Sequence, residues 1–71
     1  MSEYLIVIEK TETGYSAYSP DVDGCVAAGE TIEEVEQLMN KALESHLEIM
    51  AEEGYEIPKP HTLARYAKIA A

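Results

Sequence analysis

The sequence predicts a small α+β domain in which one long helix packs on an antiparallel sheet, in the order β-β-β-α-β. Three short segments rich in β-branched, aromatic and small residues precede position 30 and are separated by turn-forming residues, as in an antiparallel meander. Apolar residues then recur at helical spacing, which indicates an amphipathic helix. A proline-containing connector and a last apolar stretch complete the pattern.

The three strands are predicted from short local patterns. Tyr4 to Lys10 (YLIVIEK) is apolar on both faces, which indicates a strand covered on both sides. The following TETG predicts a turn in which Gly14 takes a positive φ, and Tyr15 to Ser19 (YSAYS) alternates like the second strand of a hairpin. PDVDG predicts two successive turns, and CVAAG, residues 25–29, predicts a short third strand.

The helix is the clearest element. Thr31 followed by Glu34 is the capping-box arrangement, and Gly54 supplies a stop. A helix from Ile32 to Glu53 would be roughly 33 Å long at ~1.5 Å per residue. Its apolar side chains cover about half of the circumference, which is more than one small sheet needs to bury. We therefore predict a homodimer or larger oligomer with an interface on the flank formed by Leu43 and Leu47. The Leu38 flank, the strand edges and the tail are the alternatives.

The tail is predicted to return to the sheet. Pro58 and Pro60 bias the residues before them away from the helical conformation, so YEIPKP is an extended connector. LARYAKIA, residues 63–70, is compatible with a strand or a short helix. We favour a strand from Arg65 to Ala70, because a fourth strand would cover an edge of the sheet.

Size and composition limit the possible functions. With 71 residues the chain buries only ~60% of its unfolded surface, so its core is marginal and dimerisation is a common remedy. No apolar run approaches the ~18 residues of a membrane span and the N-terminus lacks a signal peptide, which predicts a cytoplasmic protein. Cys25 is the only cysteine, which excludes an internal disulfide and a cysteine cluster for zinc.

The charge is strongly negative and unevenly placed. The net charge is −9. All fourteen carboxylates lie between Glu3 and Glu56 with only two lysines, a charge of −12, whereas the last fifteen residues carry three basic residues and no acid. Such a surface repels phosphate backbones, so we expect no direct nucleic-acid binding. It either attracts a basic protein partner or keeps a small protein soluble.

The C-terminal half of the helix is the best candidate for that partner. Glu48, Glu52 and Glu53 lie where the helix dipole disfavours negative charge, and Lys41 is the only basic residue of the helix. Either a basic residue of the tail (Lys59, Arg65 or Lys68) folds back beside this cluster, or a basic partner does, or the cluster is merely solvated. We predict that Glu44, Glu48 and Glu52 help to recruit a basic partner.

The motif PDVDGC suggests a metal or thiol site at first sight. The chain lacks the further oxygen ligands of a calcium loop, and two carboxylates with a thiol mix hard and soft ligands. No base lies near Cys25 in the sequence. His46 lies in the apolar stripe of the helix and is expected to be packed, whereas His61 is expected to be solvated. We predict no metal, no cofactor and no catalytic residue, and interpret the motif as turns.

Taken together, these motifs resemble the HicB-like antitoxin domain. The resemblance rests on YLIVIEK, GYSAYSPDVDGC, GETIEEV, NKALESHLE and IPKP, in that order and over nearly the whole chain. The family pattern has Pro, Asp and Ala where this chain has Asp23, Glu30 and Val35. None of these departures disturbs the topology.

The resemblance implies a single domain over residues 1–71 with a degraded ribonuclease H-like fold, usually dimeric or tetrameric. Complete antitoxins of this family bind the HicA toxin, a small basic protein that cleaves messenger RNA, and carry a C-terminal DNA-binding domain. We expect that domain to be missing here, because the chain stops at Ala71. Five motif residues are expected to serve geometry, in turns, a tight strand exit and a helix cap: Pro20, Asp21, Gly24, Gly29 and Thr31.

Three functional hypotheses follow. The first is an acidic binding module that sequesters a basic HicA-type toxin. The second is a stand-alone homo-oligomeric domain without a toxin, which leaves room for a small ligand. The third, a residual nuclease with two metal ions, finds little support, because no spacing marks Glu9, Asp21, Glu30 and Glu34 as convergent. We therefore expect a protein that is not an enzyme.

Overall fold

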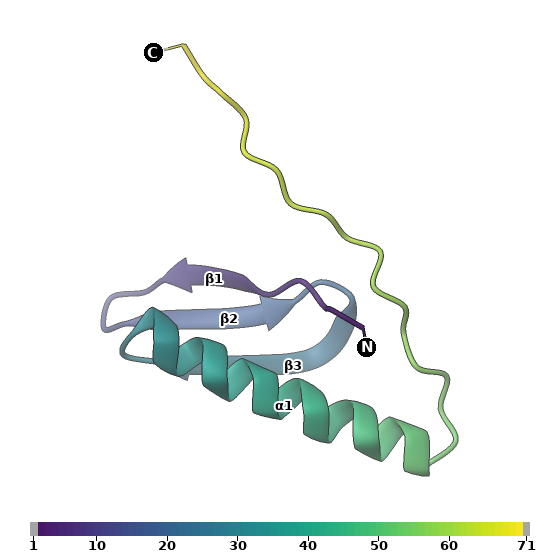
Figure 1. The fold of residues 1–71 in the computed structure, drawn as a ribbon. Coiled ribbons are helices and arrows are strands. Elements are labelled where there is room, and N and C mark those ends of the chain that lie inside the picture. The colour runs from purple at the N-terminus through teal and green to yellow at the C-terminus, as the bar shows by residue number, and fades with distance from the viewer. Residues whose placement is uncertain (1, 71) are drawn as a thin grey trace.

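The computed structural model describes residues 2–70, which form a three-stranded antiparallel sheet with one long helix on one face (Figure 1). The elements are β1 (Val7–Lys10), β2 (Tyr15–Ser19), β3 (Val22–Gly29) and α1 (Ile32–Glu52). The strand order is β1-β2-β3, so each strand pairs with its neighbour in the sequence. The predicted α+β fold class is confirmed.

The β1–β2 turn needs its glycine for room, not for an unusual backbone angle. The Thr11 N–H donates to the Gly14 carbonyl oxygen at 2.8 Å, and the Gly14 N–H donates to the Thr11 hydroxyl at 3.0 Å. Within residues 2–70, positive φ angles occur only at Gly24 and Gly54, so the positive φ predicted for Gly14 is wrong. A Cβ at Gly14 would instead collide with the carbonyl oxygen of Gly29. Close approach of two backbones is one of the standard uses of glycine.

The β2–β3 connection is shorter than predicted. The turn consists of Pro20 and Asp21, and Val22 already belongs to β3. The predicted second turn at Asp23 and Gly24 is therefore wrong, because these residues lie inside the strand. The pairing of β2 with β3 shifts register between Tyr18 and Ser19, which is the mark of a β-bulge.

Both ends of α1 are closed by local hydrogen bonds. The Thr31 side chain accepts a hydrogen bond from the Glu34 N–H at 3.1 Å. The Glu34 carboxylate accepts in turn from the N–H of Glu30 at 2.7 Å, one residue further back than in the standard capping box. At the other end, the Tyr55 N–H donates to the Met50 oxygen at 2.8 Å and Gly54 has a φ of +81°, which is a Schellman motif.

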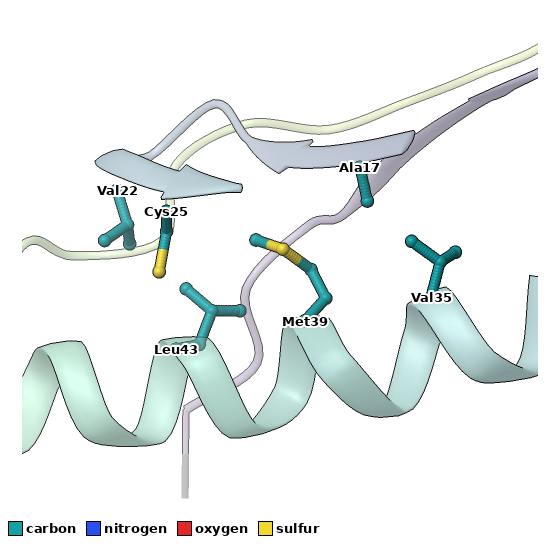
Figure 2. Packing of buried hydrophobic residues seen from close by; sticks show 6 residues of the cluster. All are labelled: Ala17, Val22, Cys25, Val35, Met39 and Leu43. Atoms are coloured by element: carbon teal, nitrogen blue, oxygen red, sulfur yellow. The ribbon is translucent and has the colours of Figure 1, made fainter. Parts of the chain in front are cut away.

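The core is a single layer between the sheet and the helix (Figure 2). Val35, Met39 and Leu43 are spaced by one turn along α1 and point at the sheet. The buried hydrophobic residues are Ala17, Val22, Cys25, Val35, Met39 and Leu43. Partly buried side chains, among them Tyr4 and Ile8, pack around this cluster.

The opposite face of the sheet is not covered by any other part of residues 2–70. The strand register places Val7 opposite Tyr18, and Tyr18 opposite Val26, in one row across the sheet. Tyr18 and Val26 are exposed, whereas their neighbour Ala17 is buried against α1. The prediction that the first strand is covered on both faces is therefore not met within the protomer.

The segment after α1 is extended and pairs with no strand. Residues 55–70 contain neither helix nor strand, and Figure 1 shows them running away from the sheet towards the C-terminus. The fourth strand predicted from Arg65 to Ala70 is therefore not formed in the single chain, and neither is the alternative short helix. No helix among residues 2–70 is long and apolar enough to cross a membrane.

Candidate protein-binding surface

The three predicted partner-binding carboxylates form an exposed row on α1. Glu44, Glu48 and Glu52 follow one another at intervals of four residues, and all three are exposed. Side chains with this spacing are neighbours on a helix surface, where like charges repel each other. The last turn of α1 contains no basic residue. We call these three residues the acidic row.

No basic residue of the tail neutralises the acidic row. Within residues 2–70, the one contact at salt-bridge distance joins His61 to Asp21, and none involves a lysine or arginine. Lys59, Arg65 and Lys68 therefore do not form the fold-back pairing that was one of the predicted alternatives. The negative charge of the acidic row therefore stays exposed to solvent and can attract a positively charged molecule.

A shallow hollow lies beside the acidic row. Its volume is about 530 Å³, and it is bordered by the N-terminal segment and the middle of α1. Its lining residues are Ser2, Glu3, Tyr4, Asn40, Leu43 and Glu44. Because Glu3 and Glu44 face the same hollow, the negative surface extends from the helix to the start of the chain.

Asp21 has a role that its sequence position does not reveal. Its side chain has no exposed surface and accepts three hydrogen bonds from the C-terminal segment. Oδ2 accepts from the backbone N–H of His61 at 3.0 Å and of Thr62 at 3.1 Å, and Oδ1 accepts from the Thr62 hydroxyl at 2.5 Å. These bonds fasten the tail to the β2–β3 turn. We call this group of contacts the Asp21 clasp.

The clasp favours the ionised form of Asp21. The hydrogen bond from the Thr62 hydroxyl lowers the pKa of the carboxyl below its ordinary value of 3.8, and burial partly opposes this effect. The two backbone N–H groups lower the pKa further. The His61 ring lies 3.3 Å from Oδ1 through Nδ1 but is 75% exposed, so the expected solvation of His61 holds for its ring and not for its backbone.

The other motif residues have separate local tasks. Pro20 lies in the exposed β2–β3 turn, Gly24 has a φ of +80° within β3, and Thr31 caps α1. Gly29 lies where an added Cβ would come within 2.6 Å of the Glu34 carboxylate oxygen, so its lack of a side chain leaves room for the helix cap.

The predicted interface pair is divided between core and surface. Leu43 is buried in the core of the protomer, whereas Leu47 is only half-buried. Leu38 and Ile49 remain exposed on α1, so the helix carries more apolar surface than the sheet covers. The interface role of Leu43 and Leu47 stays a prediction.

Apart from the contact between His61 and Asp21, the chemistry-bearing side chains of residues 2–70 do not gather in one site. Among residues 2–70, no three His, Cys, Asp or Glu side chains are grouped so that they could hold a metal ion. Burial raises the pKa of the Cys25 thiol, which keeps it protonated and a poor nucleophile at neutral pH. His46 is half-buried on α1.

Comparison with known proteins places this chain in a family. The model of a family described as the HicB-like antitoxin of bacterial toxin–antitoxin systems matches residues 4–70. The chain belongs to the HicB-like antitoxin family. A chain of the HicA3 and HicB3 toxin–antitoxin complex is 37% identical with a TM-score of 0.70, over 83% of this chain and 69% of the other. The crystal structure of the antitoxin HicB3 is 38% identical with a TM-score of 0.68, over 80% of this chain and 42% of the other.

Relatives known from sequence differ in length. An uncharacterised 14.9 kDa protein of Haemophilus phage HP1 is 40% identical over 63 residues, which are 89% of this chain and 47% of the phage protein. A UPF0150 protein of Synechocystis is 32% identical over 87% of this chain and 80% of its own length. The chain thus spans about half the length of the phage relative and most of the cyanobacterial one.

Proposed function

We propose that this HicB-like chain is a cytoplasmic binding module that sequesters a small, basic, RNA-cleaving toxin of the HicA type. The observation that carries the proposal is the likeness of the sheet and helix to a chain of the HicA3 and HicB3 complex, at 37% identity. The module acts by binding the toxin, so that the toxin cannot cleave RNA, and it catalyses no reaction of its own. A toxin with an excess of lysine and arginine complements its surface.

The acidic row supports the proposal and suggests where the toxin is first attracted. Glu44, Glu48 and Glu52 are exposed and are held on a rigid helix with no cation in its last turn. Repulsion among these residues is relieved when a cation approaches them. We propose that the acidic row, together with Glu3 and the hollow next to it, steers the toxin during association.

The test uses the basic protein encoded beside the gene for this chain. Equimolar addition of the chain should stop RNA cleavage by that protein, and the association rate should fall as salt rises, because steering is screened. The triple variant Glu44→Gln, Glu48→Gln, Glu52→Gln should associate more slowly. The control Glu9→Gln, Glu12→Gln, Asp23→Asn makes the same change of net charge on the sheet and its first turn. Its association rate should fall much less than that of the acidic-row variant.

Two results would contradict the proposal at different levels. If the neighbouring basic protein neither binds the chain nor loses its activity, the sequestering function is wrong and a stand-alone homo-oligomeric domain becomes the better reading of the family. If both variants slow association equally, net charge alone steers the partner and the acidic row is not a site. RNA cleavage by the purified chain with Mg²⁺ or Mn²⁺ would contradict the non-enzymatic role.

A further inference from the structure

The hollow beside the acidic row is built from two segments that lie far apart in the chain. Residues 2–4 contribute from the start of the chain, and Asn40, Leu43 and Glu44 contribute from α1. Figure 1 shows the N-terminal segment running beside this helix. The Tyr4 hydroxyl donates to the Pro58 carbonyl oxygen at 2.5 Å, which fastens the N-terminal segment to the connector after α1. The hollow therefore has a shape that the fold defines.

The lining of the hollow combines apolar surface with two carboxylates. Leu43 is 7% exposed and Tyr4 is half-buried, so these two residues form its floor. Glu3 and Glu44 are exposed and form its rim. Among residues 2–70, no lysine or arginine lines the hollow, and neither carboxylate forms a salt bridge. A negative rim above an apolar floor complements a side chain with an apolar stem and a cationic head.

Arginine matches this lining better than lysine does. Glu3 and Glu44 come from different segments, so a cation between them must donate hydrogen bonds in more than one direction. A guanidinium group presents several N–H donors in a planar fork, whereas the ammonium group of lysine is compact and strongly hydrated. The ring of Tyr4 offers a surface on which a guanidinium group stacks. The side-chain carbonyl of Asn40 is a further acceptor.

The acidic surface continues beyond the hollow, which indicates that the arginine belongs to a protein. Glu48 and Glu52 extend the negative charge along α1 and do not line the hollow. A free amino acid or polyamine would fill the hollow and leave these two carboxylates without a partner. A basic protein surface complements the hollow and the rest of the acidic row together.

We propose that the hollow binds one arginine side chain of the basic partner, with its guanidinium group between Glu3 and Glu44. The methylene stem of this arginine lies on Leu43 and Tyr4. The inference rests on the proposed function, because the partner is the sequestered toxin. It adds the contact that holds the complex together after the acidic row has attracted the toxin. Exposed charges that steer a partner set the association rate, whereas a charge pair removed from water sets the dissociation rate.

The first test separates these two rates in the complex with the basic protein encoded beside the gene. Glu3→Gln, Glu44→Gln removes both carboxylates of the hollow and should raise the dissociation rate about tenfold or more. The control Glu48→Gln, Glu52→Gln removes the same charge from α1 outside the hollow, and it should slow association without changing the dissociation rate. Equal dissociation rates for the two variants would overturn the inference alone. A basic protein that does not bind the unmodified chain would overturn the proposed function as well.

The second test fills the hollow from within the chain. Asn40→Arg places a guanidinium group one helical turn from Glu44, where the two side chains can pair. This variant should release the partner about tenfold faster or more, because its own arginine competes for the hollow. The control Ser45→Arg adds the same charge at an exposed position of α1 outside the hollow, and its dissociation rate should stay unchanged. Similar dissociation rates in both variants, with circular dichroism showing both to be folded, would contradict the proposal.

The third test identifies the arginine on the partner. Each arginine of the basic protein is replaced by lysine in turn, and the dissociation rate is measured with the unmodified chain and with Glu3→Gln, Glu44→Gln. One replacement should raise the dissociation rate about tenfold with the unmodified chain and have little further effect with the variant. If the effects of every replacement simply add to those of the variant, the hollow holds no arginine and the proposal is wrong.

Discussion

Removal of the acidic row should make the free protein more stable. Glu44 and Glu48 form one pair of like charges at i,i+4 spacing, and Glu48 and Glu52 form a second. Each such pair costs about 0.2–0.5 kcal/mol on an exposed helix surface. Glu52 also lies in the last turn of α1, where the helix dipole adds a penalty of about 0.3–1 kcal/mol. Glutamine has nearly the same helix propensity as glutamate, so the charges dominate the change.

The sum predicts a measurable rise in stability. Screening by salt reduces the sum of these penalties. The triple variant Glu44→Gln, Glu48→Gln, Glu52→Gln should therefore raise the free energy of unfolding by about 1 kcal/mol. For a domain of this size, that is a rise in melting temperature of about 4–8 °C. Thermal unfolding followed by circular dichroism at one fixed protein concentration measures it, because self-association makes the melting temperature depend on concentration. Repetition in 1 M salt, where the Debye length is ~3 Å, should remove most of the gain.

The control has the same change of net charge away from α1. Glu9→Gln, Glu12→Gln, Asp23→Asn alters exposed residues of the strands and the first turn, none of which forms an i,i+4 pair on the helix. Its melting temperature should rise less than that of the acidic-row variant. An unchanged or lower melting temperature in the acidic-row variant would refute the reasoning. A lower melting temperature together with an unaltered association rate would mean that these carboxylates serve the fold, and their proposed role in recruiting a partner should then be dropped.

Three further predictions concern the core, the clasp and the first turn. Met39 has no exposed surface, so Met39→Ala should lower the free energy of unfolding, measured by denaturant titration, by about 2–5 kcal/mol. The control Leu38→Ala changes a residue that is 42% exposed. It should lower the free energy of unfolding much less in the same titration. Asp21→Asn should speed hydrogen exchange at the Thr62 amide, because one carbonyl oxygen cannot replace both carboxylate oxygens. Since folding lowers the pKa of Asp21, the stability contributed by the clasp should be complete above pH 3.8 and lost as the pH falls through the folded-state pKa. Gly14→Ala should cost about 1–3 kcal/mol by overpacking, measured by denaturant titration.

The features predicted correctly from the sequence depend on residues close together in the chain. The cap joins Thr31 to Glu34, three positions apart, and the stop at Gly54 depends on the φ of one residue. Strand β2 was predicted with its observed bounds, Tyr15–Ser19, because its alternation is complete within five residues. In each case the physical cause and the sequence signal lie in the same short segment.

The features predicted wrongly depend on contacts between distant residues. Gly14 is constrained by the Gly29 backbone, a neighbour that only the folded β-meander provides. Asp21 does lie in the predicted turn, but its hydrogen bonds to His61 and Thr62, which cross about forty positions of the chain, were not predicted. A buried carboxylate that receives backbone N–H groups leaves no signature in either segment alone.

The missing fourth strand has a different cause. Residues 63–70 have the composition of a strand, yet they contribute no pairing within residues 2–70. Strand propensity mainly reflects packing against neighbours, so composition alone does not place a segment in a sheet. The strand predicted from Arg65 to Ala70 is therefore wrong for the single chain.

The separation of charge along the chain bears on the proposed function. The acids are confined to residues 1–56, whereas Arg65 and Lys68 lie among the last residues of the chain. Within residues 2–70, neither of these two residues forms a salt bridge with the acidic row, whose members are exposed on α1. The row therefore keeps its negative charge available for the basic partner of our proposal.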